Sequence, residues 1–193
     1  MGTYSNKAQK TKKYLIDITM DLLTKEPWSE ISVNDIARTA NVNRSTFYRY
    51  FLDKNDLIRQ VESAILNKLT LEHQQVLKKI DGSTTTAFND DSYIKAAVAI
   101  IDDNHQLLSV LLSSQANTGF DDRLEEKLRE MIVSSIRNLN PETINKNSKI
   151  ISHYYAAGFV GLIKLWLVDS QYSRKEILNF IQESTREGAF ATL

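Results

Sequence analysis

Apolar residues recur along almost the whole chain with the 3.6-residue period of an α-helix. Leu15, Ile18 and Leu22 share one face early in the chain, and Leu57 and Val61 begin a longer series spaced by four. The pattern predicts helices over about residues 8–25, 33–40, 44–50, 54–80, 91–101, 104–114, 120–138, 148–169 and 174–188. No alternating run of β-branched residues is long enough for a sheet, so the sequence predicts an all-α fold.

The second and third predicted helices are short and are separated by a turn of three residues, which is typical of a helix-turn-helix. Ser32 and Asp35 have the spacing of a capping box in which Asp replaces the usual Glu. Asn41 suits a left-handed turn residue, and Asn43 can cap the helix that follows. Residues 32–50 therefore form the candidate functional segment.

The second helix of this pair divides into an apolar and a polar side. At about 100° per residue, Phe47 and Phe51 fall together and are expected to point inward. The polar side carries hydroxyl and guanidinium groups, and two tyrosines occupy the shoulders between the sides, where a ring can be buried and its hydroxyl exposed. The polar and shoulder residues are Ser45, Thr46, Arg49, Tyr48 and Tyr50.

Arg44 lies in the first turn of this helix, where a cation opposes the helix dipole by ~0.3–1 kcal/mol. A phosphate or a guanine edge in front of Arg44 would reverse the sign of that interaction. The alternative is a solvated arginine that pairs with Asp35 or Asp53.

Charge and composition narrow the possible functions. The chain has 24 Lys and Arg against 24 Asp and Glu, but residues 1–60 contain 10 basic and 7 acidic residues, an excess of three positive charges. The first third is therefore the better candidate for contact with a polyanion. The chain has no cysteine, and its three histidines lack metal-ligand spacing. Without a nucleotide-binding or nucleophile motif either, the sequence predicts no enzyme activity, no cofactor and no metal.

Residues 15–61, above all Ser32–Phe51 followed by Lys54, resemble the N-terminal domain of the tetracycline-repressor (TetR) family. The resemblance implies a helix-turn-helix DNA-binding domain at residues 1–53 and a helical effector-binding and dimerisation domain at residues 54–193. It assigns contacts with bases or phosphates to the recognition helix and phosphate contacts to the starts of two other helices. The implied DNA-binding residues are Ser32, Arg44, Ser45, Thr46, Tyr48, Arg49, Tyr50 and Lys54.

The segment Tyr154–Leu167 resembles one recurrent type of TetR C-terminal domain. Gly158 and Gly161 each cost ~1 kcal/mol in a helix relative to Ala, and close approach of another helix would offset that cost. We expect these glycines and Trp166 at a two-fold dimer interface; alternatively, the glycines serve packing within one subunit. The aromatic residues Phe88, Tyr93, Tyr154, Phe159 and Trp166 either line a ligand pocket or belong to the core.

The expected function is a homodimeric repressor that binds a palindromic operator in double-stranded DNA. An unidentified small-molecule effector would alter the spacing of the two recognition helices. The alternative is a TetR-like interaction protein that acts through a protein partner without an operator of its own. The polar N-terminus and the modest length of the apolar run Tyr154–Val168 predict a cytoplasmic protein without a membrane span.

Overall fold

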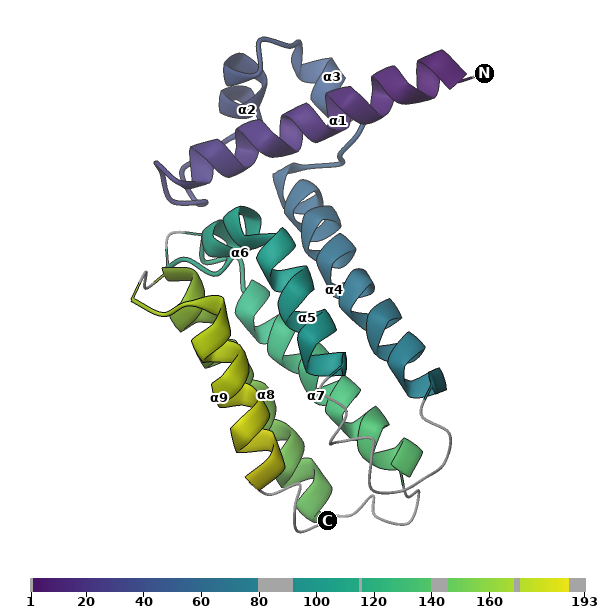
Figure 1. Ribbon diagram of the computed structural model, residues 1–193. Helices are drawn as coiled ribbons and strands as arrows, with labels where there is room; N and C mark the ends of the chain where they lie inside the picture. Colours follow the sequence, from purple (N-terminus) through teal and green to yellow (C-terminus); the bar gives the residue numbers. More distant parts are fainter. Residues whose placement is uncertain (1, 80–91, 115, 140–145, 169–170, 188–193) are drawn as a thin grey trace. The chain divides into compact units, whose positions relative to one another are not determined.

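The computed structural model describes residues 2–79, 92–114, 116–139, 146–168 and 171–187, and within these ranges every regular element is a helix (Figure 1). The helices are α1 (Gly2–Leu23), α2 (Val33–Thr39), α3 (Arg44–Tyr48), α4 (Lys54–Lys79), α5 (Ser92–Asp103), α6 (His105–Leu111), α7 (Phe120–Leu139), α8 (Lys146–Val168) and α9 (Arg174–Glu187). The all-α prediction is confirmed. The helix α1 begins earlier than its apolar pattern indicated, and α3 ends before Tyr50. The connection between the helices predicted at residues 54–80 and 91–101 lies outside the described residues.

The chain divides into two compact units. Unit 1 comprises Met1–Ala64 and Val110–Thr118, and unit 2 comprises Ile65–Ser109 and Gly119–Leu193. The helix α4 contributes to both units, because the division falls within it.

Unit 1 has a core formed by the inner faces of its first four helices. Leu15 of α1, Ile36 of α2, Phe47 of α3 and Leu57 of α4 are all fully buried. The rings of Phe47 and Phe51 lie 5.3 Å apart between centroids and anchor α3 from behind. The expected inward orientation of both phenylalanines is thereby confirmed.

The helix ends in unit 1 follow the local signals in the sequence. Ser32 and Asp35 form the reciprocal capping box at the start of α2, and Asn43 Oδ1 accepts a hydrogen bond of 2.9 Å from the Ser45 amide at the start of α3. Asn41 has φ of 51°, so it supplies the left-handed turn between the two helices. These local contacts fix the angle at which α3 leaves α2.

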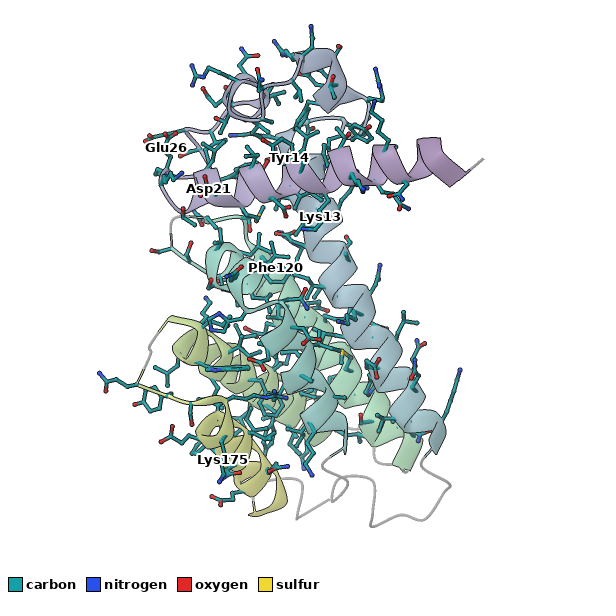
Figure 2. The ribbon with its side chains drawn as sticks, turned by 45° about the horizontal axis from the view of Figure 1, so that its top comes forward. Lys13, Tyr14, Asp21, Glu26, Phe120 and Lys175 are labelled. Atoms are coloured by element: carbon teal, nitrogen blue, oxygen red, sulfur yellow. The ribbon has the colours of Figure 1, made fainter. Side chains whose placement is uncertain are left out.

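Unit 2 is a helical bundle in which α7 packs against α8 and α5 against α9. Phe120, which begins α7, is fully buried, whereas Lys175 of α9 is exposed (Figure 2). Lys164 of α8 forms a 2.6 Å ion pair with Asp121 of α7, and this hydrogen bond holds the pKa of Asp121 below its usual value.

The helix α8 is the most apolar element. Its stretch Asn147–Leu167 is 21 residues long and has the length and composition of a membrane span, unlike the shorter run considered in the sequence. Core helices of soluble domains meet the same criterion, and Ala156, Val160 and Ile163 are buried within unit 2. The buried side of α8 therefore belongs to the core of unit 2.

His73 of α4 is a buried polar residue of unit 2. It is 3% exposed, and its Nε2 atom lies 2.8 Å from the hydroxyl of Ser135 on α7. Burial lowers the pKa of His73 below 6.5, because the charged imidazolium loses hydration.

We expect His73 to make the free energy of unfolding depend on pH. Below pH 6.5 the unfolded chain takes up a proton that the folded chain resists, so stability falls by at most about 1.4 kcal/mol per pH unit as the pH drops toward the folded pKa. Urea unfolding between pH 7 and pH 5 measures this slope. The His73→Gln variant should have a shallower slope, while the exposed-histidine control His153→Gln should keep it. Equal slopes in His73→Gln and the parent protein would contradict the assignment.

Candidate nucleic-acid interface

The helix α3 presents polar side chains on the side opposite its buried phenylalanine. Arg44, Ser45 and Arg49 are exposed, Tyr48 is 45% exposed, and Thr46 is half-buried. Arg49 directly follows the last residue of α3 and forms its C-cap. These residues, all expected from the sequence to contact DNA, lie together around one short helix.

Arg44 and Tyr48 form a pair on the exposed side of α3. The Arg44 Nη2 and Nε groups donate to the Tyr48 hydroxyl at 2.8 and 3.3 Å, and the guanidinium carbon lies 5.2 Å from the centroid of the tyrosine ring. Arg44 pairs with neither carboxylate considered in the sequence. Asp35 bonds instead to Arg38, and Asp53 lies 3.9 Å from Arg59. The tyrosine therefore holds the guanidinium on the exposed surface, where its remaining N–H groups can donate to a base or a phosphate.

Ser32 is exposed at the start of α2, and its hydroxyl is occupied by the cap. It donates to Asp35 Oδ2 at 2.5 Å and accepts from the Asp35 amide at 3.2 Å. The hydrogen bond from Ser32 is the main reason that the pKa of Asp35 lies below its usual value. A phosphate at this position would have to compete with that carboxylate for the hydroxyl proton.

Lys54 occupies a different environment from the one expected of a phosphate ligand. Its ammonium group donates to the carbonyl oxygens of Trp28 at 2.7 Å and Ile31 at 2.6 Å, and it lies 4.7 Å from the centroid of a Trp28 ring. Burial lowers the pKa of Lys54. The lysine thus fastens the segment after α1 to the first turn of α4, and its charge is directed toward the protein.

We expect Lys54→Met to lower the free energy of unfolding by roughly 1–2 kcal/mol, because charge-assisted hydrogen bonds to two carbonyls are lost. Chemical denaturation measures the change, with Lys10→Met, an exposed lysine of α1, as the control. Unchanged stability together with weaker DNA binding would instead indicate a direct phosphate contact.

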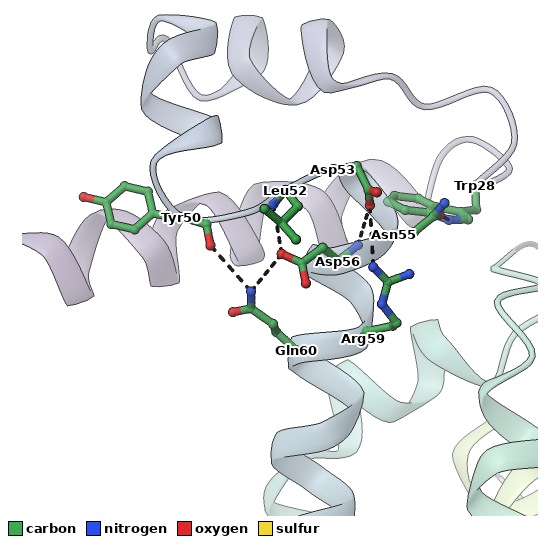
Figure 3. A network of polar contacts seen from close by, with 8 residues as sticks. All are labelled: Trp28, Tyr50, Leu52, Asp53, Asn55, Asp56, Arg59 and Gln60. Carbon is green, nitrogen blue, oxygen red and sulfur yellow. Dashed lines mark hydrogen bonds and ion pairs between the residues drawn. The ribbon is translucent and has the colours of Figure 1, made fainter.

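A polar network joins the end of the helix-turn-helix to the start of α4 (Figure 3). Gln60 Nε2 donates to Asp56 Oδ2 at 3.0 Å and to the Tyr50 carbonyl at 3.5 Å, and the Leu52 amide donates to the same carboxylate oxygen at 2.9 Å. The ring of Tyr50 extends away from Gln60 in this view. Asp56 and Gln60 are therefore positioning residues that the sequence analysis missed. The spacing of three residues between Asp53 and Asp56 was a local signal of a helix cap, and in the structure the Asp56 amide donates to Asp53 Oδ1 at 2.7 Å.

The helix α1 contributes further lysines to unit 1. Lys13 pairs with Asp17 at 2.9 Å and is exposed beside Tyr14 (Figure 2), and Lys10 is also exposed. Lys12 lies 5.7 Å from the centroid of the Phe51 ring.

The outer face of α8 carries the two glycines expected at a dimer interface. Gly158 and Gly161 are exposed, and a Cβ atom built on either would meet no atom within 4 Å among the described residues, apart from the backbone of α8 itself and the neighbouring residues in the chain. With Ile150, Tyr154 and Leu165, which are 59%, 71% and 38% exposed, they recur at spacings of three or four residues. We call these five residues the outer stripe of α8.

Trp166 does not belong to the outer stripe. It is only 6% exposed and lies inside unit 2, with its ring centroid 6.2 Å from that of His105 in an edge-on arrangement. Trp166 and Phe159 line an internal cavity, whereas Tyr154 is on the surface. Phe88 and the side chain of Tyr93 lie outside the described residues.

The arrangement in unit 1 defines a class of protein. Two short helices meet at a tight turn, and the second is anchored by phenylalanines and exposes arginine, hydroxyl and tyrosine groups, as in helix-turn-helix DNA-binding proteins. Residues 15–61 match the family model described as bacterial regulatory proteins of the tetR family, and residues 90–187 match that of a transcriptional regulator C-terminal region. The chain belongs to the TetR family of transcriptional regulators.

Relatives and solved structures agree with this assignment. The transcriptional regulator AcrR of Shigella flexneri is 24% identical over 183 residues, which cover 85% of this chain and 81% of the relative. A TetR-family regulator from Syntrophomonas wolfei has a TM-score of 0.75 at 16% identity, covering 92% of this chain and 94% of that one. NalD, described as the secondary repressor of the MexAB-OprM multidrug efflux pump in Pseudomonas aeruginosa, has a TM-score of 0.65 at 18% identity, covering 94% and 97%. At these identities the structural likeness establishes the fold.

Proposed function

We propose that this TetR-family regulator is a cytoplasmic, homodimeric, ligand-responsive repressor that binds a palindromic operator in double-stranded DNA. The observation that carries the proposal is the exposed Arg44–Tyr48 pair on α3, because the opposite side of this helix is buried in the core of unit 1 through Phe47. Such a helix fits the major groove, where arginine can bond bidentately to guanine. The proposed DNA contacts are Arg44, Ser45, Thr46, Tyr48, Arg49 and Tyr50, with Ser32 at the edge of the footprint and Lys54 as a positioning residue.

The outer stripe of α8 supports the dimeric state. An exposed apolar stripe on a helix is typical of a surface that binds another protein. The two glycines cost ~1 kcal/mol each in a helix, and no described residue of their own unit uses the space that they leave. A second copy of α8 packed across a two-fold axis would use it, so each subunit would present the same stripe to the other.

Two-fold symmetry gives the operator its form. The two recognition helices would occupy half-sites one helical turn apart, about 34–36 Å, or a multiple of that distance. An effector bound among the helices of unit 2 would favour one setting of the subunits and thereby change the separation of the recognition helices. The effector can do so only to the extent that its affinity differs between the two settings.

The salt dependence of DNA binding tests the DNA-binding role. A dimer that neutralises six phosphates should have a slope of log K against log salt concentration of about −5 on duplex DNA. Fluorescence anisotropy with a labelled duplex, measured from 50 to 200 mM salt, gives this slope, and analytical ultracentrifugation of the same samples gives the oligomeric state. A monomer, or an affinity that is flat over this range, would contradict the proposal.

A further inference from the structure

Unit 2 contains an apolar cavity of about 60 Å³ between α5, α7, α8 and α9. Its lining side chains are all aliphatic or aromatic, within the described part of the unit. The buried part of its wall is formed by Val98, Ile101, Leu128, Ile163, Trp166, Ile177 and Ile181.

The lining of the cavity includes both buried and half-buried side chains. Ile101 and Ile177 lie next to the ion pair that joins Asp102 of α5 to Arg174 of α9 at 2.8 Å. Ala97 and Ile94 lie one and two turns before Ile101 along α5, away from that pair, and both are half-buried. Ile132 and Phe159 are half-buried as well, so these four residues form the rim.

Such a lining holds water poorly. A buried water needs two to four polar partners, and the lining side chains offer essentially none. A carboxylate or an ammonium group inside would lose its hydration without gaining a counter-charge, because Asp102 and Arg174 already neutralise each other. By contrast, a hydrocarbon group gains contact with Trp166 and Phe159 and with the aliphatic wall.

The size of the cavity limits the ligand. Since one water-sized group needs ~10–15 Å³ by this measure, the cavity holds about four to six such groups, which corresponds to one six-membered ring with any substituent at the half-buried rim. We infer that this cavity binds an uncharged hydrocarbon group of about that size, and that this is the chemistry of the effector. The inference deepens the proposed ligand response and rests on it.

Toluene and benzoate test the ligand class, because both carry one six-membered ring and only benzoate is charged. We expect isothermal titration calorimetry to detect toluene binding to the full-length protein and at least ~100-fold weaker binding of benzoate. Toluene should also raise the melting temperature through mass action. Absence of toluene binding, or equal affinity for benzoate, would overturn the inference and show the cavity to be a packing void or another kind of site.

Two variants locate the bound ring. Ala97→Met fills the rim and should weaken toluene binding by at least ~10-fold, whereas Ala64→Met, on an exposed face of α4 in unit 1, should leave it unchanged. Phe159→Ala enlarges the cavity and should improve binding of naphthalene relative to toluene by several-fold. Unchanged toluene binding in Ala97→Met, or an unchanged naphthalene preference in Phe159→Ala, would place the ligand elsewhere and overturn the inference.

The DNA-binding measurement separates this inference from the proposed function. If toluene binds in the cavity but leaves the affinity for operator DNA unchanged, the hydrocarbon site is supported and the proposed response to it fails. If the affinity for DNA falls steeply as the salt concentration rises but the protein does not bind toluene, the hydrocarbon site is contradicted and the DNA-binding function remains.

Discussion

Replacement of Arg44 by alanine is expected to reduce the affinity for the operator by at least ~30-fold. A bidentate contact with a base is worth ~1–3 kcal/mol, and a dimer loses one in each half-site. Fluorescence anisotropy on operator DNA at fixed salt measures the loss. The fold should be retained, because Arg44 is exposed and bonds only to Tyr48 among the described residues.

The control is Arg137→Ala, which removes the same charge from an exposed position on α7 in unit 2. Tyr48→Phe is a second comparison, because it removes the hydroxyl that holds the guanidinium and keeps the ring. We expect it to lose less affinity than Arg44→Ala. If the Arg44→Ala protein binds operator DNA as tightly as the parent, or if Arg137→Ala loses as much DNA affinity, α3 is not part of the DNA interface.

The second large effect is expected from leucine at both glycines of α8. Gly158→Leu combined with Gly161→Leu should convert the dimer to a monomer, whose mass is close to the 22.1 kDa of the parent chain, because the side chains fill the space proposed for the partner helix. Neither new Cβ atom meets an atom within 4 Å in the described part of its own unit, and leucine favours a helix by ~1 kcal/mol relative to glycine. The helix content of the variant should therefore persist while operator affinity falls by at least ~100-fold, since two half-sites no longer bind together.

Sedimentation velocity and circular dichroism check the two parts of this prediction. Gln75→Leu adds the same side chain at an exposed position of α4 and should remain dimeric. A double-leucine variant that stays dimeric would exclude the outer stripe as the interface. A variant that loses its helix content would show instead that the glycines serve packing within the subunit.

Local sequence signals were sufficient where one short contact decides the outcome. The Ser32–Asp35 box, the Asn43 cap and the left-handed Asn41 each depend on residues within three positions, and the structure has all three. The periodicity of α3 likewise placed its phenylalanines inward. These contacts define the helix-turn-helix without knowledge of the rest of the chain.

Longer-range placements could not be predicted. The hydrogen bonds from Lys54 to the Trp28 and Ile31 carbonyls join residues more than twenty positions apart in the sequence. The sequence around Lys54 therefore did not distinguish a structural lysine from a phosphate ligand at a helix start. The helix α8 is apolar on every side, and its periodicity therefore did not separate the inward Trp166 from the outward Gly158. The Arg44–Tyr48 pair has helical spacing, but the choice of Tyr48 over a nearby carboxylate depends on side-chain rotamers.

Selection of duplexes from a random pool is the most direct test of the DNA-binding role. The purified parent protein should enrich a palindromic sequence whose half-sites are separated by about 34–36 Å or a multiple of it, and the Arg44→Ala protein should not enrich the same sequence. Enrichment of no sequence by a folded, dimeric protein would contradict the account and favour a regulator that acts through a protein partner.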